Sequence, residues 1–183
     1  MSQSALADWL ARLTPVDDAP LIAVWGEAHR LERRFYATPE APPDDLVSSV
    51  RAVMFRKSAV MVVRDHDGSG HIMPGGRRES GETQEDALAR EIGEETGWRF
   101  ETARRFGFLH FRHLTPKPDG YAYPYPDFFQ TLHVVEATDH DRRRIVRDDW
   151  ETHSRMTPIA RALTAVRNEQ QPILRLAVAA RGL

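Results

Sequence analysis

The chain has 183 residues, of which 41% are hydrophobic and 28% are charged, and its formal net charge is −2. This length is enough for one sizeable core, and the small net charge gives no general attraction to nucleic acid or to a membrane surface. The absence of cysteine excludes disulfides, thiolate metal sites and cysteine nucleophiles. No apolar run has transmembrane length, and the N-terminus lacks the pattern of a secretory signal peptide. We therefore expect a cytoplasmic protein.

The N-terminal residues 1–48 are predicted to form a helical extension. Residues 3–13 have apolar side chains on one side and precede Pro15, which favours a short helix. A second helical pattern covers residues 20–36, and the proline-rich residues 37–45 are typical of a linker or ordered loop. The apolar stripes would pack on the remaining chain or on a second copy, so the extension is compatible with a homodimer.

Residues 49–183 show a mixture of strand and helix patterns. The expected elements are strands at 50–55, 59–64 and 71–73, a helix at 84–96, strands at 104–112 and 128–137, and a helical segment at 158–180 interrupted at Pro172. Two loops stand out, a proline- and tyrosine-rich loop at 114–127 and a charged loop at 138–149. Strands arranged around a central helix, with further helices behind, predict an α/β sandwich.

The stretch from Gly75 to Trp98 carries the densest chemistry. Its acidic residues are Glu79, Glu82, Glu85, Asp86, Glu91, Glu94 and Glu95. Thr83 is a suitable N-cap for the helix, and Gly97 suits its C-terminal end. At about 100° per residue, Glu91, Glu94 and Glu95 lie on one face.

Three carboxylates on one helix face have two interpretations. They form either a solvated acidic surface or a binding site for a hard cation, because carboxylate oxygens suit Mg²⁺ or Mn²⁺. On this helix only Arg90 is placed to neutralise a neighbour, namely Glu94 four residues later. The spacing favours the metal site.

This segment resembles the Nudix box, the signature of the Nudix hydrolase superfamily. The fixed positions of that box are filled by Gly76, Glu82, Arg90, Glu91, Ile92, Glu94, Glu95, Gly97 and Trp98. The resemblance implies the Nudix fold, a mixed β-sheet sandwiched between helices, here with the N-terminal helical extension at 1–48 and the hydrolase domain at 49–183. It also implies a pyrophosphohydrolase that needs Mg²⁺, with Mn²⁺ as an alternative, and that takes a small-molecule nucleotide.

The resemblance assigns roles within the box. Glu91, Glu94 and Glu95 would be the metal-binding carboxylates, and Gly76 or Gly75 would add a backbone carbonyl. Arg90 would orient the glutamates, and Glu82 would brace the glycine loop. The general base is either a box glutamate, with Glu91 preferred, or an acid outside the box. The outside candidates are Asp148, Asp149, Glu151, Glu136 and Asp139.

Substrate contacts are expected from residues beside and beyond the box. Arg77 and Arg78 follow the glycine pair and would meet phosphates, or are solvent-exposed turn residues. Tyr123 and Tyr125 in the long loop would stack on a nucleobase, or simply make a rigid, packed loop. His110 and His113 show no metal-ligand spacing and are expected to do no chemistry.

The box does not identify the substrate. The proline and tyrosine positions that distinguish known subfamilies are not matched here, since the first such residues after the box are Pro116 and Tyr121. We favour a nucleoside diphosphate linked to another moiety, such as ADP-ribose or a nucleotide sugar. The alternatives are a housecleaning nucleoside triphosphate pyrophosphatase and a non-catalytic nucleotide-sensing domain.

Overall fold

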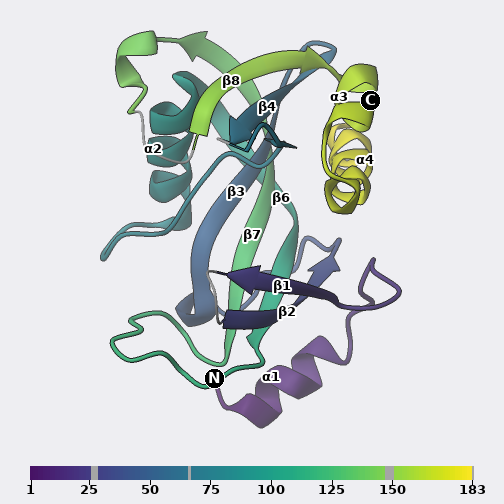
Figure 1. Ribbon diagram of the computed structural model, residues 1–183, viewed down its shortest axis with the longest axis vertical. Coiled ribbons are helices and arrows are strands. Elements are labelled where there is room, and N and C mark those ends of the chain that lie inside the picture. Colours follow the sequence, from purple (N-terminus) through teal and green to yellow (C-terminus); the bar gives the residue numbers. More distant parts are fainter. Residues whose placement is uncertain (26–28, 66, 147–150, 183) are drawn as a thin grey trace. The chain divides into compact units, whose positions relative to one another are not determined.

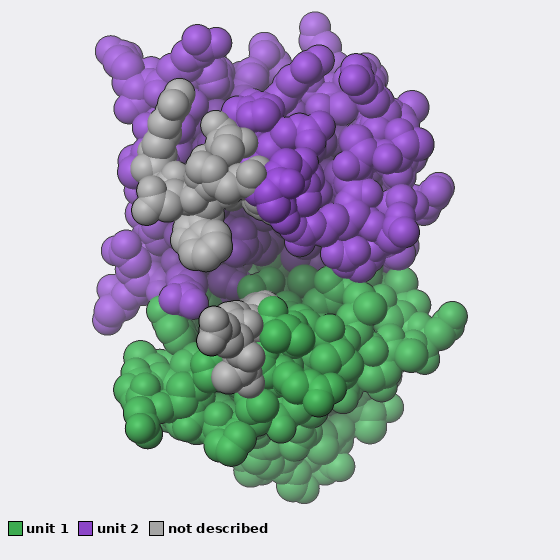
Figure 2. Space-filling view, viewed as in Figure 1, with its two compact units in different colours: residues 1–48, 107–131 green, residues 49–106, 132–183 purple. Residues whose placement is uncertain are grey.

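The computed structural model describes residues 1–25, 29–65, 67–146 and 151–182. They group into two compact units (Figure 2). Unit 1 consists of Met1–Ser48 and Gly107–Thr131, and unit 2 consists of Ser49–Phe106 and Leu132–Leu183. No helix among the described residues is both long and apolar enough to cross a membrane.

The secondary structure is a mixed, curled sheet with helices, as Figure 1 shows. The strands are β1 (Leu21–Trp25), β2 (His29–Tyr36), β3 (Val47–Arg56), β4 (Ala59–Asp65), β5 (Gly70–His71), β6 (Trp98–His113), β7 (Asp127–His140) and β8 (Glu151–Pro158). The helices are α1 (Gln3–Leu10), α2 (Gln84–Thr96), α3 (Ile159–Ala165) and α4 (Gln171–Arg181), with 3₁₀ turns η1 (Asp44–Leu46), η2 (Arg142–Arg144) and η3 (Asn168–Gln170). The pairing order is β1-β2-β6-β7-β3-β4-β5, and β8 also pairs with β4.

In unit 2, helix α2 packs on one face of the sheet. Alternate residues of β3, among them Val50, Ala52 and Met54, form a buried cluster with Leu88 and Ile92 of the helix. This alternation is what a strand requires when one of its faces meets a helix. The apolar stripe of α2 is thereby buried, and its acidic face is left for other contacts.

Helices α3 and α4 cover the other face of the unit 2 strands (Figure 1). Ile173 and Leu174 of α4 are fully buried, and the Arg181 guanidinium lies 4.9 Å from the centre of the Phe55 ring. Pro172 lies in the first turn of α4, where a missing N–H costs no hydrogen bond. The sheet lies between helices, which confirms the predicted α/β fold class.

In unit 1, α1 packs through Leu6 against Phe108 and Phe129. The Trp9 ring stacks on Phe108 with centroids 5.5 Å apart. The helix predicted at the N-terminus is therefore confirmed, although it ends at Leu10.

The second N-terminal helix, predicted at 20–36, is wrong. These residues form strands β1 and β2, and β2 pairs antiparallel with β6 from Leu31↔His113 to Tyr36↔Phe108. Leu31 and Phe35 are both buried, and a spacing of four places two residues on the same side of a helix and of a strand alike. The edge of β6 decides between them, because it supplies partners for the backbone of β2.

Two elements after residue 137 differ from the prediction. Residues 138–149 were expected to be a charged loop, but β7 continues to His140 and a 3₁₀ turn follows at Arg142–Arg144. Strand β8 was not anticipated at all. Its sequence, ETHSRMTP, has Met156 as its main apolar residue, so it lacks the hydrophobic run that indicates a buried strand. The long loop at 114–127 is confirmed, ending where β7 begins.

Candidate functional site

Helix α2 forms where the sequence predicts it. The Thr83 hydroxyl accepts a hydrogen bond from the Asp86 backbone N–H at 3.1 Å and so caps the N-terminus. Gly97 ends the helix in the left-handed conformation at φ 73°. Between these ends, Glu91, Glu94 and Glu95 lie in the last turns of one rigid helix.

The glycine pair before the helix runs beside β3. The backbone N–H of Val50 donates to the Gly76 carbonyl at 2.9 Å, and that of Ala52 donates to the Pro74 carbonyl at 2.9 Å. Gly75 has φ 130°, and a side chain there would collide with the Val50 carbonyl. At Gly76, an added Cβ would overlap the Glu91 carboxylate. The missing side chains therefore let the backbone lie directly against β3 and against Glu91.

Arg90 is the centre of the charged network. Its Nε and Nη2 donate to the two carboxylate oxygens of Glu82 at 2.7 and 3.0 Å. Its Nη1 donates to Glu91 Oε1 at 2.9 Å and to Glu94 Oε2 at 3.2 Å. Nη2 also reaches the Arg77 carbonyl at 3.0 Å. One guanidinium thus holds Glu82, Glu91 and Glu94 in a single arrangement, with the two-pronged geometry that arginine offers to a carboxylate.

Glu82 connects the loop after the glycines to the helix. Besides its bonds to Arg90, it accepts the backbone N–H of Glu79 at 2.8 Å, and its own carbonyl accepts Arg78 Nη2 at 2.9 Å. The hydrogen bond from Arg90, followed by that from Glu79, lowers the pKa of Glu82 to about 2. Glu82 is therefore ionised at neutral pH and is fully engaged in holding the loop.

Two of the remaining box carboxylates, Glu91 and Glu95, contact the glycine segment. Glu95 Oε2 accepts the Gly75 backbone N–H at 2.7 Å. Glu91 is half-buried, and burial raises its pKa, against the opposing effect of the Arg90 hydrogen bond. Glu94 is the more exposed of the two partners of Arg90 Nη1, with 40% of its side chain accessible against 16% for Glu91. Glu94, which is the most accessible partner of Arg90, and Glu91 and Glu95, which lie beside the glycines, form an acidic surface that can bind a cation.

Two arginines that sequence reasoning missed also belong to this region. Arg51 of β3 donates from Nη1 to the Met73 carbonyl at 3.3 Å, and its charge acts on Glu91. Arg144 of η2 lies against Gly93 and donates to the Trp98 carbonyl at 3.4 Å. Arg51 had a visible signal, because it is the charged residue within the otherwise uncharged run from Val47 to Phe55.

The predicted substrate residues lie in both units. Arg77 is exposed and Arg78 is half-buried, both in the loop after the glycines of unit 2. Tyr123 and Tyr125 are half-buried in unit 1. The Tyr125 hydroxyl donates to the Thr115 carbonyl at 3.0 Å, which ties it into its own loop.

The two histidines that were expected to do no chemistry have hydrogen-bond partners in their own unit. His110 Nε2 lies 2.8 Å from Asp127 Oδ1, and His113 Nε2 lies 3.1 Å from the Tyr121 hydroxyl. All of these residues belong to unit 1.

The candidate bases outside the box are differently placed. Glu136 Oε2 accepts a hydrogen bond from Arg181 Nη2 at 3.0 Å, and Asp139 is exposed near the end of β7. Asp148 and Asp149 lie outside the described residues, as does the side chain of Glu151.

The box residues fit a magnesium ion by donor chemistry. In the described ranges, no three His, Asp or Glu side chains are already gathered around a common point that could enclose a metal. Mg²⁺ does not require such a cage, because it keeps several waters and binds through a few carboxylates together with substrate phosphates. Glu91, Glu94 and Glu95, beside the carbonyls of the glycine pair, supply the hard oxygens that this mode uses.

Comparison with known proteins gives one family. The NUDIX domain family matches residues 45–177 of the chain. Among curated protein sequences, none shows significant similarity to this chain.

Solved structures resemble the chain in fold at low identity. The pyrophosphohydrolase BsRppH from Bacillus subtilis, in a mutant form, superposes with a TM-score of 0.59 at 14% identity, over 82% of this chain and 93% of its own. A NUDIX hydrolase from Nitrosomonas europaea gives 0.53 at 20% identity, over 73% and 89%. The MutT NUDIX hydrolase from Burkholderia pseudomallei gives 0.50 at 16% identity, over 70% and 95%.

Proposed function

This chain belongs to the Nudix hydrolase superfamily and is a pyrophosphohydrolase, and we propose that its substrate is a nucleoside diphosphate linked to another moiety, of the ADP-ribose or nucleotide-sugar type. Enzymes of the family generally require a divalent metal, and we propose Mg²⁺, with Mn²⁺ as an alternative. The observation that carries the proposal of a metal-dependent site is the Arg90 network, which holds Glu91 and Glu94 in one arrangement.

The metal would be held by Glu91, Glu94 and Glu95 and by a backbone carbonyl. The Gly76 carbonyl accepts one hydrogen bond from Val50, and a carbonyl oxygen has a second lone pair for a cation. When bound, the metal neutralises phosphate charge and lowers the pKa of a coordinated water. Gly75 is the alternative source of the carbonyl.

The other box residues position the reacting groups. Arg90 fixes the orientation of Glu91 and Glu94 through ion pairs of 2.9 and 3.2 Å. Arg77 and Arg78 would bind the phosphate oxygens, since guanidinium groups match phosphate geometry. Tyr123 and Tyr125 would contact the base.

We propose Glu91 as the residue that takes the proton from the attacking water. It is half-buried, and its carboxylate lies against the Gly76 backbone, so its position is well defined relative to the glycine segment. Asp148, Asp149 and Glu151 remain the alternatives outside the box.

The rival functions make different products. A housecleaning enzyme would release pyrophosphate from a nucleoside triphosphate, whereas the favoured enzyme would release a nucleoside monophosphate and a phosphorylated second moiety. A sensing domain would bind nucleotide without turnover. The engagement of the box carboxylates with Arg90 and Gly75 supports catalysis over sensing.

A product assay tests the proposal. The purified chain is incubated with Mg²⁺ and, separately, ADP-ribose, UDP-glucose and each deoxynucleoside triphosphate, and the products are identified by mass. We expect AMP and ribose 5-phosphate from ADP-ribose, or the corresponding pair from UDP-glucose. Pyrophosphate from a triphosphate as the dominant product would replace the favoured function by its rival. Glu95→Gln protein purified in parallel is the control for contaminating hydrolases.

We also propose that residues 49–183 are the hydrolase domain and residues 1–48 an extension, built of α1 and the β1–β2 hairpin. The start of the family match at residue 45 and the unit boundary after Ser48 support this division. Unit 1 also includes residues 107–131.

A homodimer formed through the extension is part of this proposal, and sedimentation tests it.

A further inference from the structure

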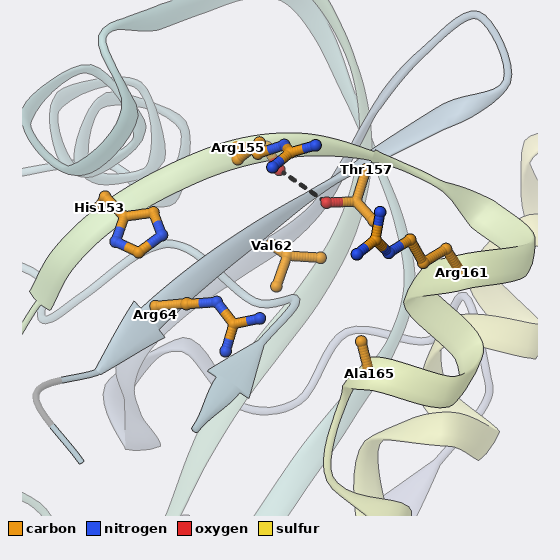
Figure 3. Close-up of a pocket in the computed structure, with 7 residues that line it drawn as sticks. All are labelled: Val62, Arg64, His153, Arg155, Thr157, Arg161 and Ala165. Carbon is orange, nitrogen blue, oxygen red and sulfur yellow. Dashed lines mark hydrogen bonds between the residues drawn. The ribbon is translucent and has the colours of Figure 1, made fainter. Parts of the chain in front are cut away.

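Unit 2 contains a small cavity on the face of the sheet opposite to α2. Its volume is about 70 Å³, and β4, β8 and α3 contribute its walls (Figure 3). The lining side chains are Val62, Arg64, His153, Arg155, Thr157, Arg161 and Ala165. A cavity of this volume holds a few waters, and so it has room for one small oxyanion group but not for a nucleoside.

Strand and helix periodicity explain why these residues meet. Arg155 is paired with Val62, and His153 with Arg64, in the antiparallel register of β4 and β8. Alternate residues of a strand lie on one face, and so do residues four apart on a helix. Arg161 and Ala165 of α3 are four apart and therefore line the same cavity. Met61 and Val63, which alternate with Val62, belong to the core cluster packed against α2.

The charge of the cavity is one-sided. Three of its seven lining residues are arginines, a fourth is a histidine, and none is an acid. Among the described residues, the side chains of Arg155 and Arg161 form no ion pair. Arg64 Nη1 donates to the Gly68 carbonyl at 2.8 Å, which holds its guanidinium in place. Arg155 and Arg161 therefore present two positive charges to the cavity, and an anion bound there would neutralise them.

We propose that this cavity binds a phosphate group, either as free phosphate or as the terminal group of a phosphomonoester. Guanidinium groups donate several hydrogen bonds in a plane that matches phosphate oxygens, and the Thr157 hydroxyl adds a polar group at the wall. The site uses none of the box residues, so the inference is independent of the proposed catalytic function.

Inorganic phosphate is the first probe. Binding is followed by amide chemical shifts of the protein in buffer containing EDTA, at constant ionic strength maintained with chloride. EDTA matters because phosphate binding through the box carboxylates would need a divalent metal. We expect saturable shifts at Val62, Thr157 and Ala165. In separate titrations at higher chloride concentrations, the affinity for phosphate should weaken.

Arginine variants locate the site. Arg155→Gln and Arg161→Gln should each weaken phosphate binding by about tenfold or more, because each removes a charge-assisted hydrogen bond. Both residues are exposed, so the variants should keep the melting temperature of the parent chain. Arg175→Gln, at an exposed position of α4, is the matched control and should bind as the parent does.

A second probe separates the two sources of phosphate. If phenyl phosphate binds as tightly as inorganic phosphate, the ligand is a phosphomonoester. If inorganic phosphate binds more tightly, the ligand is the free ion. The proposal is overturned if neither probe shifts the cavity amides, or if Arg155→Gln and Arg161→Gln bind phosphate as tightly as the parent. It is also overturned if Arg77→Gln, beside the box, abolishes binding while the cavity variants do not.

Discussion

Two hydrogen-bonded carboxylates, one in each unit, have different roles: one is paired with an arginine and the other with a histidine. In unit 2, Glu82 and Arg90 are joined at 2.7 Å with 17% and 25% of their side chains exposed. In unit 1, Asp127 and His110 are joined at 2.8 Å with 1% and 9% exposed. The first pair extends to Glu91 and Glu94, whereas the second is enclosed by the core.

The difference follows from the cost of burying charge. An ionised group that is fully buried must be paired, and removing its partner leaves an uncompensated charge. Burial by itself would raise the pKa of Asp127, but the hydrogen bond and charge of His110, the charge of Arg112 and a hydrogen bond from Gln3 together lower it. A partly exposed cluster avoids most of that cost and stays accessible to ligands. We therefore expect mutations in the box to change activity, and mutations in the buried pair to change stability.

The largest expected effect is on catalysis. Glu95→Gln should lower kcat with the substrate identified in the product assay by about a thousandfold, corresponding to ~4 kcal/mol of activation free energy, because it removes one charge of the proposed metal site. Steady-state kinetics at varied Mg²⁺ measures it, and the melting temperature should stay close to that of the parent.

Glu85→Gln is the matched control on the same helix. Glu85 is exposed in the first turn of α2 and has no role in the proposed site, so its loss should leave kcat within about twofold of the parent. Equal activity of the Glu95→Gln and Glu85→Gln proteins would show that the acidic face of α2 is only a solvated surface.

The second effect is on stability. Asp127→Asn should lower the free energy of unfolding by about 3 kcal/mol, because His110 loses its charged partner in the core. Urea denaturation measures this, with Asp119→Asn, at an exposed position of the same unit, as the control. A loss below about 0.5 kcal/mol, within the range of surface substitutions, would contradict the structural role of the pair.

The last effect is a pH dependence of stability, which comes from the buried imidazole of His133 in unit 2. Burial lowers the pKa of His133 from 6.5 to about 4, so between these values the unfolded chain binds a proton that the folded chain does not. The contribution of neutral His133 to the free energy of unfolding is therefore fully present above pH 6.5. It is lost as the pH drops toward 4, and the loss is at most about 3 kcal/mol. Glu82, with its pKa lowered to about 2, loses its contribution in a lower window, as the pH falls from 4.5 toward 2.

Denaturation curves between pH 7.5 and 4 measure the contribution of His133. His133→Gln should flatten this pH dependence, whereas His153→Gln, at an exposed position of β8, should not. An unchanged slope in the His133→Gln protein would assign the titration to another group.

The box helix was predictable because its signals are local. Thr83, Gly97 and the spacing of Glu91, Glu94 and Glu95 act within a few residues of one another, so the helix and its acidic face follow from periodicity and capping. The α/β class was predictable for a similar reason, since the alternation in β3 depends only on which face is buried.

Elements that depend on distant partners were not predictable in this way. Strand β2 was mistaken for a helix because its register with β6 joins residues far apart in the chain. Strand β8 was missed because it has little hydrophobic pattern and owes its place to pairing with β4. Arg51 had a sequence signal, a charge in an otherwise uncharged strand, but only the fold brings it near Glu91.

By itself, the sequence determined the chemistry of this protein. The order and spacing of the box residues decide which oxygens share one helix face, because 3.6 residues make a helical turn. The tertiary structure alone decided what those residues contact. It brought Gly75 against Val50 and Glu95, and it gathered Arg64, Arg155 and Arg161 around one cavity. Contacts of this kind depend on strand pairing and packing between segments far apart in the chain, which no local pattern encodes.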